Sequence, residues 1–191
     1  KAAVKDTCET KKTDERHVYA DLAAFTVEKY VKERKVIDPA EYFDKKGIMA
    51  SADDLKMKAG VFVSIKERGE LRGCIGTISP TCVNILAEIV QNAISASSKD
   101  PRFDPVREGE LGDLCFSVDV LGQTEDISSF DELDPKRYGV VVTRGYRRGL
   151  LLPDLEGVDT PSQQVAIALR KGGISPAEKY DMQRFEVIRY R

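Results

Sequence analysis

The chain has 191 residues, of which 41% are hydrophobic and 32% are charged, and its formal net charge is −2. This composition is typical of a folded globular protein and excludes a disordered chain. The mildly acidic balance gives no general affinity for nucleic acid or for an anionic membrane surface.

No apolar run approaches the roughly 18 residues that a membrane-spanning helix needs, and no signal peptide opens the chain, so we expect a cytoplasmic location without a membrane partner. The sequence begins at Lys1 rather than at a methionine, which suggests a processed protein or a piece of a longer one. The cysteines are Cys8, Cys74, Cys82 and Cys115, and the single histidine is His17. Because no CxxC pair occurs, we expect reduced thiols, no disulfide framework and no metal site.

The N-terminal segment Lys1–Thr13 is polar and predicts a tail or linker before a folded domain over residues 14–191. A helix is predicted from about Asp14 to Arg34, capped by Thr13 or Asp14, because apolar residues recur on one face. His17 falls in its first turns and is expected to be a partly exposed helical residue. An irregular connection, punctuated by Asp38-Pro39 and Gly47, is expected as far as Lys58.

The stretch Gly60–Pro80 predicts a β-hairpin, because two runs of strand-type residues flank a short turn that contains Gly69. In the return strand, alternation places Arg72 and Cys74 on one face and Leu71 and Ile75 on the other. Glycine inside a strand gives up packing and indicates a close approach of backbone or ligand, which applies to Gly73 and Gly76.

After the hairpin, Ser79-Pro80 predicts the start of a helix over Thr81–Ser97 with a broad apolar face. The following segment, 99–105, contains two prolines that restrict its path, so it is expected to present Asp100, Arg102 and Phe103 in defined directions. A plain solvated connection is the alternative.

The remaining chain alternates strands with one helix. Leu114–Leu121 predicts a strand with Leu114, Phe116, Val118 and Val120 facing inward. The other expected elements are a turn or short helix within Glu125–Leu133, a second hairpin with strands Tyr138–Thr143 and Arg148–Leu152, a helix from Thr160-Pro161 to Lys171, and a final strand Gln183–Tyr190. Hairpins with helices between them predict an α+β fold with a mostly antiparallel sheet flanked by helices.

Three motifs carry a resemblance to a known family. LRGCIG at Leu71–Gly76 resembles the signature of the AMMECR1-domain family, DPRF at Asp100–Phe103 resembles the element after its central helix, and RGLLLP at Arg148–Pro153 resembles a third element. The resemblance covers nearly the whole chain apart from the tail. It implies a main sheet flanked by helices, a smaller subdomain and a cleft between them. The segment Asp154–Gln164 departs from the usual continuation of the family.

The resemblance also implies partners. Similar proteins are encoded beside, or fused behind, a Memo-like protein, together with a radical-SAM protein, so the chain is expected to be the C-terminal part of such a fusion or to work with those proteins. No cofactor is assigned by the sequence, since no Walker or GxGxxG pattern occurs.

Cys74 is the candidate catalytic residue, because nearby arginines favour a thiolate, although cysteine is also a common core residue. Arg72 could bind a carboxylate or phosphate, or form an ion pair with Asp100 or another acid. The other candidate cleft-lining residues are Gly73, Gly76, Asp100, Arg102, Phe103 and Arg148. Cys82, at the start of a predicted helix, could form a redox pair with Cys74, although cytosolic disulfides are uncommon.

Two functions follow from these residues. The first is an enzyme or enzyme component whose cleft acts on a small anionic or electrophilic substrate. The second is a non-catalytic binding or scaffolding module that uses the same cleft, with Cys74 as a packing residue. The absence of a complete acid–base set, with one histidine in the chain, favours the second.

Overall fold

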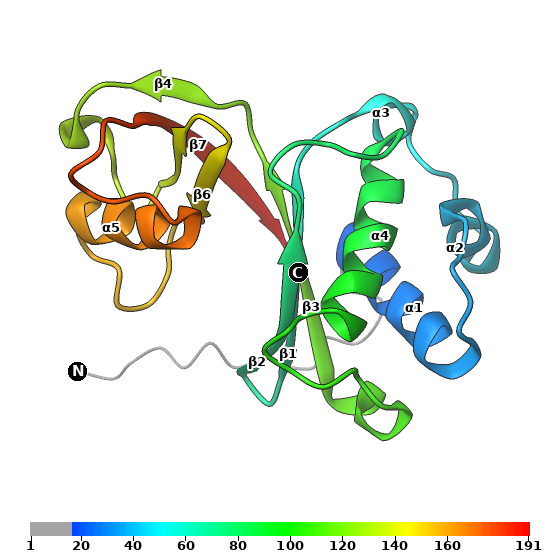
Figure 1. Ribbon diagram of the computed structural model, residues 1–191. Helices are drawn as coiled ribbons and strands as arrows, with labels where there is room; N and C mark the ends of the chain where they lie inside the picture. The colour runs from blue at the N-terminus through cyan, green and yellow to red at the C-terminus, as the bar shows by residue number, and fades with distance from the viewer. Residues whose placement is uncertain (1–16) are drawn as a thin grey trace, which may run out of the picture. The chain divides into compact units, whose positions relative to one another are not determined.

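The computed structural model describes residues 17–191 and divides into two compact units (Figure 1). Unit 1 contains residues 17–120 and 189–191, and unit 2 is Leu121–Ile188. The expected tail 1–13 lies outside the described residues. Within residues 17–191, no helix is long and apolar enough to cross a membrane.

Unit 1 joins a small antiparallel sheet to several helices. Its elements are α1 (Val18–Glu33), α2 (Pro39–Lys46), α3 (Ala52–Lys56), β1 (Val61–Glu67), β2 (Glu70–Gly76), α4 (Ile85–Ser98), η2 (Glu108–Asp113) and β3 (Leu114–Leu121), whose last residue belongs to unit 2. The strand order is β2-β1-β3, and the C-terminal end of β7 (Asp181–Tyr190) lies next to β3. Strand β2 is therefore an edge strand.

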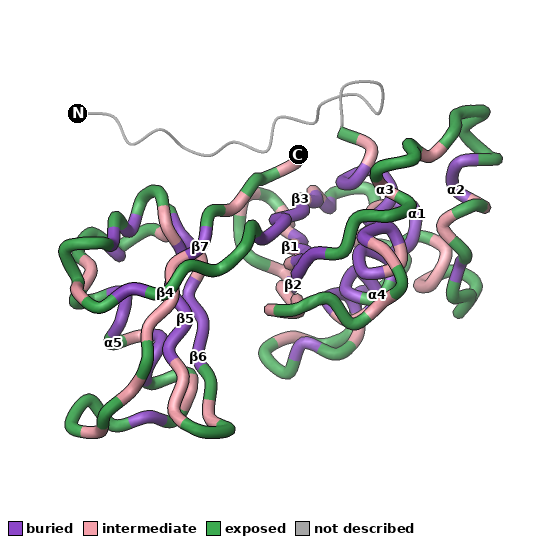
Figure 2. Tube along the Cα trace, turned by 90° about the horizontal axis from the view of Figure 1, so that it is seen from above, coloured by how far each residue is buried: buried purple, intermediate pink, exposed green. Residues whose placement is uncertain are grey.

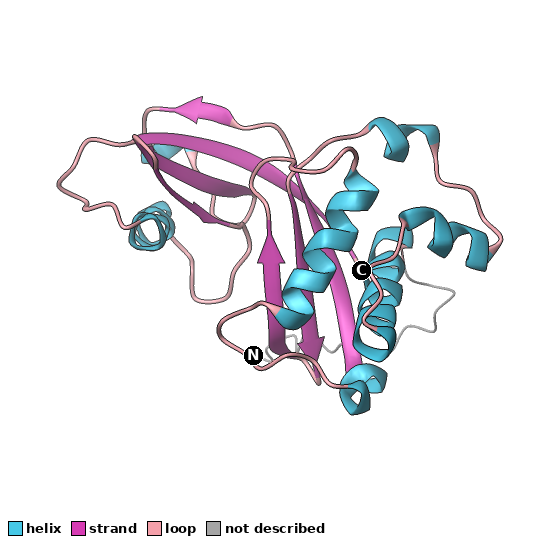
Figure 3. Cartoon of the chain, turned by 45° about the vertical axis from the view of Figure 1, so that its right-hand side comes forward, coloured by secondary structure: helices cyan, strands magenta, loops and turns pink. Residues whose placement is uncertain are grey.

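The core of unit 1 lies between this sheet and the helices. Helix α4 runs along β1 and β2 and also packs against α1 (Figure 3). Val61, Val63 and Ile65 of β1 are completely buried, and the alternating positions Phe62 and Ser64 are only half-buried. Buried residues gather in α1, α4, β1 and β3 in Figure 2. One face of the sheet therefore supplies the apolar core, as the period of two in these strands predicts.

The first hairpin forms where the sequence predicts it. Arg68 and Gly69 both have positive φ, 51° and 90°, which a two-residue type I′ turn requires. A bulge follows, because β1 advances by one residue from Ile65 to Lys66 while β2 moves two residues from Gly73 to Leu71. The extra residue is Arg72, so the predicted alternation holds from Gly73 onward and breaks at Arg72.

Helix α4 begins at Ile85, four residues later than predicted, because Asn84 rather than Ser79 caps it. The reason is a set of hydrogen bonds between α4 and the segment before it. The buried carboxylate of Glu88 accepts hydrogen bonds from the Thr77 hydroxyl (2.6 Å) and from the Thr81 and Cys82 amides (2.8 and 2.7 Å). These bonds hold residues 77–82 in a loop, so the Ser79-Pro80 start signal is not used.

Two short helices occupy the segment that was expected to be irregular. Helix α2 begins with a capping box in which the Asp38 carboxylate and Glu41 bond each other's backbone amides, and Ser51 caps α3. The Asp38-Pro39 pair, which was expected to punctuate an irregular connection, is thus a cap followed by proline at the first helical position. Helix α1 begins at Val18, and His17 is its N-cap, accepting a bond from the Tyr19 amide (3.2 Å). The caps expected at Thr13 and Asp14 lie outside the described residues.

Unit 2 has a second, separate core. Its elements are β4 (Glu125–Ile127), η3 (Phe130–Glu132), β5 (Tyr138–Arg144), β6 (Arg147–Leu151), α5 (Pro161–Gly172) and most of β7. Strand β7 pairs with β4 and β5, and β5 pairs with β6, all antiparallel. Helix α5 packs so closely on β6 that a Cβ at Gly149 would lie 1.9 Å from the Ala168 carbonyl oxygen. Strand β4, within Glu125–Leu133, was not predicted.

Helices and antiparallel strands together confirm the α+β fold class. The subdomain expected to be smaller corresponds to unit 2. The cleft that the resemblance implies stays a prediction.

Candidate functional site

The DPRF loop covers the exposed edge of strand β2 at Cys74. The Cys74 amide donates to Asp100 Oδ2 (2.9 Å), and Arg102 Nη2 donates to the Cys74 carbonyl oxygen (3.3 Å). An edge strand carries unpaired backbone donors and acceptors that a neighbouring strand would otherwise satisfy. The Asp100–Arg102 pair therefore takes the place of a partner strand at one position of the edge.

Asp100 is the centre of this arrangement. Its side chain is only 2% exposed, and it accepts bonds from Arg102 Nε (2.9 Å) and Nη2 (2.7 Å) as well as from the Arg102 amide (3.1 Å). Hydrogen bonds from Arg102 outweigh burial and lower the pKa of Asp100 to about 2. Asp100 is therefore an ionised, fully occupied acceptor rather than a base with a free lone pair.

The Cys74 thiol lies on the face of the sheet opposite α4. The Ser64 hydroxyl, directly across on β1, donates to its sulfur at 3.3 Å. Burial raises the pKa of Cys74, and the favourable effects of the Ser64 hydrogen bond and the Arg102 charge do not offset it. Asp119 and Asp100 add to the rise. The thiol is consequently the dominant form at neutral pH, which makes it a poor nucleophile.

Arg72 is an ion-paired residue. Its Nε and Nη2 atoms donate to the two carboxylate oxygens of Glu110 (2.7 and 3.2 Å), and Nη1 donates to the Asp104 carbonyl oxygen (2.9 Å). The sequence left open an ion pair with Asp100 or another acid, and the acid is Glu110. The centre of the Phe103 ring lies 6.0 Å from the Arg72 guanidinium carbon and 5.4 Å from that of Arg102.

The two glycines of LRGCIG allow close packing. A Cβ at Gly73 would lie 2.3 Å from the Ala96 carbonyl oxygen of α4, and one at Gly76 would lie 2.3 Å from the Phe62 ring. Both positions therefore need glycine for contact with neighbouring protein groups rather than with a ligand.

Sequence reasoning missed three residues of this region. Ser64 and Glu110 were not singled out, because their contacts depend on strand register and on a loop far along the chain. Asp119, buried on β3, was not singled out either, and Arg189 donates to its carboxylate at 2.7 and 3.1 Å. A buried acid in an alternating strand is a signal that could have prompted a search for its cation.

The chain matches the AMMECR1 family model over residues 20–191. The chain belongs to the AMMECR1 family. A protein of Thermotoga maritima is 46% identical over 92% of this chain and 98% of its own length, and a protein of Clostridium acetobutylicum is 44% identical over 98% of this chain. The chain spans only 38% of the length of the Clostridium protein.

The fold is also similar to a solved structure. The crystal structure of an uncharacterized protein from Pyrococcus horikoshii superposes with a TM-score of 0.78 and 28% identity, covering 90% of this chain and 88% of that one. The recognition based on LRGCIG, DPRF and RGLLLP thus reached the correct AMMECR1 family. The assignment of LRGCIG as the family's signature stays a prediction.

The remaining candidates of this AMMECR1 chain lie elsewhere. Arg148 is an exposed residue of β6 and belongs to unit 2, and its role in lining a cleft stays a prediction. Cys82 precedes α4 instead of lying in its first turn, and burial raises the pKa of its thiol. Cys74 and Cys82 are free thiols, whereas Cys115 is disulfide-bonded, so the expectation of reduced thiols does not extend to it. Among the described residues, no group of three or more His, Cys, Asp or Glu side chains is arranged to hold a metal ion.

Proposed function

We propose that this AMMECR1 protein is a non-catalytic binding module. Its binding surface is the Cys74 face, which we define as the directly opposed residues Ser64, Cys74 and Ser117 together with the neighbouring Arg102. The observation that carries the proposal is that Asp100 and Arg72, the charged residues expected beside the thiol, are already bonded to protein partners. Among residues 17–191, no free acid–base pair is therefore left beside Cys74.

The chemistry of the Cys74 face suits a small anionic ligand. Arg102 already uses Nε and Nη2, but its side chain is 54% exposed and its Nη1 is not engaged in any of the bonds that hold Asp100 and Cys74. A guanidinium edge beside two hydroxyl groups and a thiol matches a carboxylate or phosphate oxygen.

Titration of the ¹⁵N-labelled protein with succinate and with inorganic phosphate tests this ligand class. We expect shifts at Cys74, Arg102 and Ser64 for at least one of the two anions, and retention of these shifts in Cys74→Ser. Shifts that occur only outside the Cys74 face would refute the proposed surface. Arg68→Gln, which removes an exposed arginine from the turn, is the matched control.

The alternative is an enzyme in which Cys74 attacks an electrophilic substrate. The observation in its favour is a free thiol that receives a hydrogen bond from Ser64 near the Arg102 charge. Thiol-labelling rates of Cys74, measured against pH with Cys8, Cys82 and Cys115 replaced, decide between the two functions. A binding module predicts labelling that rises only above the ordinary thiol pKa of about 8.5, and fast labelling below about pH 7 would establish the nucleophile instead.

The proposal includes partners. We propose that the module works in the cytoplasm beside a Memo-like protein or domain and a radical-SAM protein. The support is the Clostridium relative, of which this chain spans 38%, since a module of this size then occurs within a longer polypeptide. Purified Memo-like protein mixed with this chain should co-elute in size-exclusion chromatography, and separate elution at concentrations of tens of micromolar would remove this part of the proposal.

A further inference from the structure

The tip of the second hairpin places an exposed aromatic ring among arginines in unit 2. Arg144 and Arg147 close the hairpin as a register pair, with Gly145 and Tyr146 as the two turn residues. Gly145 has a φ of 57°, and the Tyr146 side chain is 97% exposed. A nearly fully exposed tyrosine is unusual for a side chain that gains by burial of its ring.

One acid organises the two arginines. Glu178 Oε1 lies 2.9 Å from Arg144 Nε and 2.7 Å from Arg147 Nη2, and the Ser175 amide donates to Glu178 Oε2 (2.8 Å). Hydrogen bonding to Arg147 lowers the pKa of Glu178 to about 2, so this carboxylate stays ionised. A single carboxylate thus orders two guanidinium groups and balances only one of their charges.

Backbone contacts bind the same arginines to the segment after α5. Arg147 Nη1 donates to the Gly173 carbonyl oxygen (2.7 Å), and Arg144 Nη1 donates to the Lys179 carbonyl oxygen (2.5 Å). Fixed side chains lose little conformational entropy on binding a partner. The hairpin tip is therefore preorganised.

Further positive charge surrounds the tip. Arg170 lies in the last turn of α5, and Lys179 is exposed on the loop before β7. The end of α5 is close, since a Cβ at Gly172 would lie 3.1 Å from the Arg148 carbonyl carbon. Arg148 is left out, because alternation along β6 points its side chain to the face opposite Arg147. We name the set Arg144, Tyr146, Arg147, Arg170 and Lys179 the basic hairpin surface.

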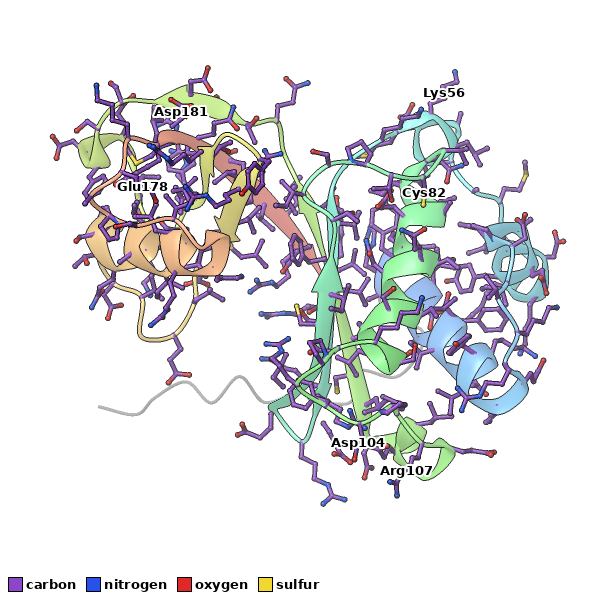
Figure 4. The ribbon with its side chains drawn as sticks, in the orientation of Figure 1. Lys56, Cys82, Asp104, Arg107, Glu178 and Asp181 are labelled. Atoms are coloured by element: carbon purple, nitrogen blue, oxygen red, sulfur yellow. The ribbon has the colours of Figure 1, made fainter. Side chains whose placement is uncertain are left out.

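A depression of about 520 Å³ adjoins this surface. Thr143, Arg144 and Gly145 line one side, and Glu178, Lys179, Tyr180 and Asp181 line the other. Glu178 and Asp181 are labelled in Figure 4. The lining carries two acids, Glu178 and Asp181, and two cations, Arg144 and Lys179. Because Glu178 is paired with Arg144 and Arg147, Asp181 is the acid that opposes an anionic partner.

We propose that the basic hairpin surface binds an acidic segment of a partner protein. Tyrosine and arginine are enriched among the residues that carry the binding energy of protein interfaces, and charge complementarity selects an acidic partner. Single-stranded nucleic acid is the less suitable occupant, because it needs several aromatic platforms for successive bases and Tyr146 is the fully exposed ring at this surface. All residues of this site belong to unit 2, whereas those of the Cys74 face belong to unit 1.

Fluorescence anisotropy of the full chain with a labelled peptide of alternating glutamate and leucine tests the proposal. We expect a Kd in the micromolar range, weaker binding as salt rises from 50 to 200 mM, and no binding of the matched glutamine–leucine peptide. Lys179→Glu should weaken binding by about tenfold and Tyr146→Ala by about fivefold. Both side chains are exposed and have no described hydrogen bond or ion pair, so the variants should fold normally.

Lys136→Glu is the matched control, because Lys136 is an exposed lysine of unit 2 outside the basic hairpin surface. It should leave the Kd within about twofold, as expected for a screened distant charge. Equal binding of the two peptides, equal loss in Lys136→Glu, or tighter binding of a labelled oligo-dT 20-mer would overturn the proposal. Concentration-dependent self-association abolished by Lys179→Glu would also overturn it and assign the surface to a second copy of this chain.

Discussion

At the scale of single residues, the candidate site is defined by what its charged groups already bind. Asp100 joins the Cys74 amide to the Arg102 guanidinium, and Arg72 is held by Glu110. Groups with all partners satisfied stabilise a structure but are poorly placed to transfer protons. The residues of the LRGCIG and DPRF motifs therefore act first to stabilise the edge of β2.

Asp100→Ala should lower the free energy of unfolding by about 2–3 kcal/mol, because it leaves the Cys74 amide without its acceptor. Asp100→Asn should cost less, about 1–2 kcal/mol, since one oxygen remains to accept. Urea denaturation measures both. Asp113→Ala, which breaks an exposed ion pair with Arg68, is the control and should cost no more than about 0.5 kcal/mol. An equal loss of unfolding free energy in Asp100→Ala and Asp113→Ala would contradict the stabilising role of Asp100.

The pH dependence of Asp100 follows from its lowered pKa. A carboxyl whose folded-state pKa is depressed stabilises the protein above its unfolded value of about 3.9 and loses that contribution as pH falls. For Asp100 the loss continues until pH passes about 2. Compared with wild type, Asp100→Asn should show a flatter stability profile between these two values, and an unchanged profile would argue against the ion pair.

His17 predicts a second pH effect. Burial lowers its pKa, and its neutral ring accepts the Tyr19 amide bond that caps α1. When the pKa of a histidine is lower in the folded state than in the unfolded state, protonation favours unfolding. The protein therefore keeps its full stability above the unfolded-state pKa of about 6.5 and loses stability as pH falls from there through the folded-state pKa. Thermal unfolding of His17→Asn, in which asparagine keeps a capping oxygen, should lack this acid loss. A wild-type melting temperature that is constant from pH 7 to 5 would contradict the role.

At the scale of elements, close packing between a helix and a strand explains the glycines of the motifs. Helix α4 approaches β2 at Gly73, and α5 approaches β6 at Gly149. In each case the nearest atom is a helix carbonyl oxygen, which cannot move without shifting the helix. The glycines therefore set the distance between the layers in both units.

Gly73→Ala should lower the free energy of unfolding by about 1–3 kcal/mol, because its methyl group would lie 2.3 Å from the Ala96 carbonyl oxygen. Gly112→Ala is the matched control, with no atom within 4 Å of the added Cβ and no positive φ. Chemical denaturation should place the control within about 0.5 kcal/mol of wild type. A neutral Gly73→Ala would show that the helix can shift without cost.

At the scale of the whole molecule, unit 2 is an insertion between β3 and the last residues of the chain. Each unit has its own apolar cluster, and Arg189, which returns the chain to unit 1, pairs with Asp119 at the end of β3. The two ends of the insertion are therefore close together. Compact units with their own cores can fold separately.

Replacement of residues 121–188 by a short Gly-Ser linker should leave unit 1 folded, with a cooperative thermal transition and the circular dichroism of a helix-rich protein. The expectation rests on the buried cluster between α1, α4 and β1, which contains no residue of unit 2. Non-cooperative melting of the shortened chain would show that unit 1 needs the inserted unit to fold.

Local signals in the sequence were sufficient for most of the elements. The turn at Arg68-Gly69, the alternation of Leu114–Leu121 and the cap at Thr160-Pro161 all depend on neighbouring residues, and each was predicted correctly. The start of α4 was wrong because Glu88 reaches back to residues 77–82 and overrides a local cap signal. Propensity yields to such tertiary contacts.

The fold class, the family and the polar residues near Cys74 could all be predicted from the order of the amino acids. How those residues are used depends on contacts that form only in the folded chain. Glu110 lies 38 positions from Arg72, and Ser64 faces Cys74 because of strand register. Hydrogen bonding and burial depend on distance in space, which periodicity along the chain does not encode. For Cys74, the predicted nucleophile, burial in the folded chain raises the pKa of the thiol.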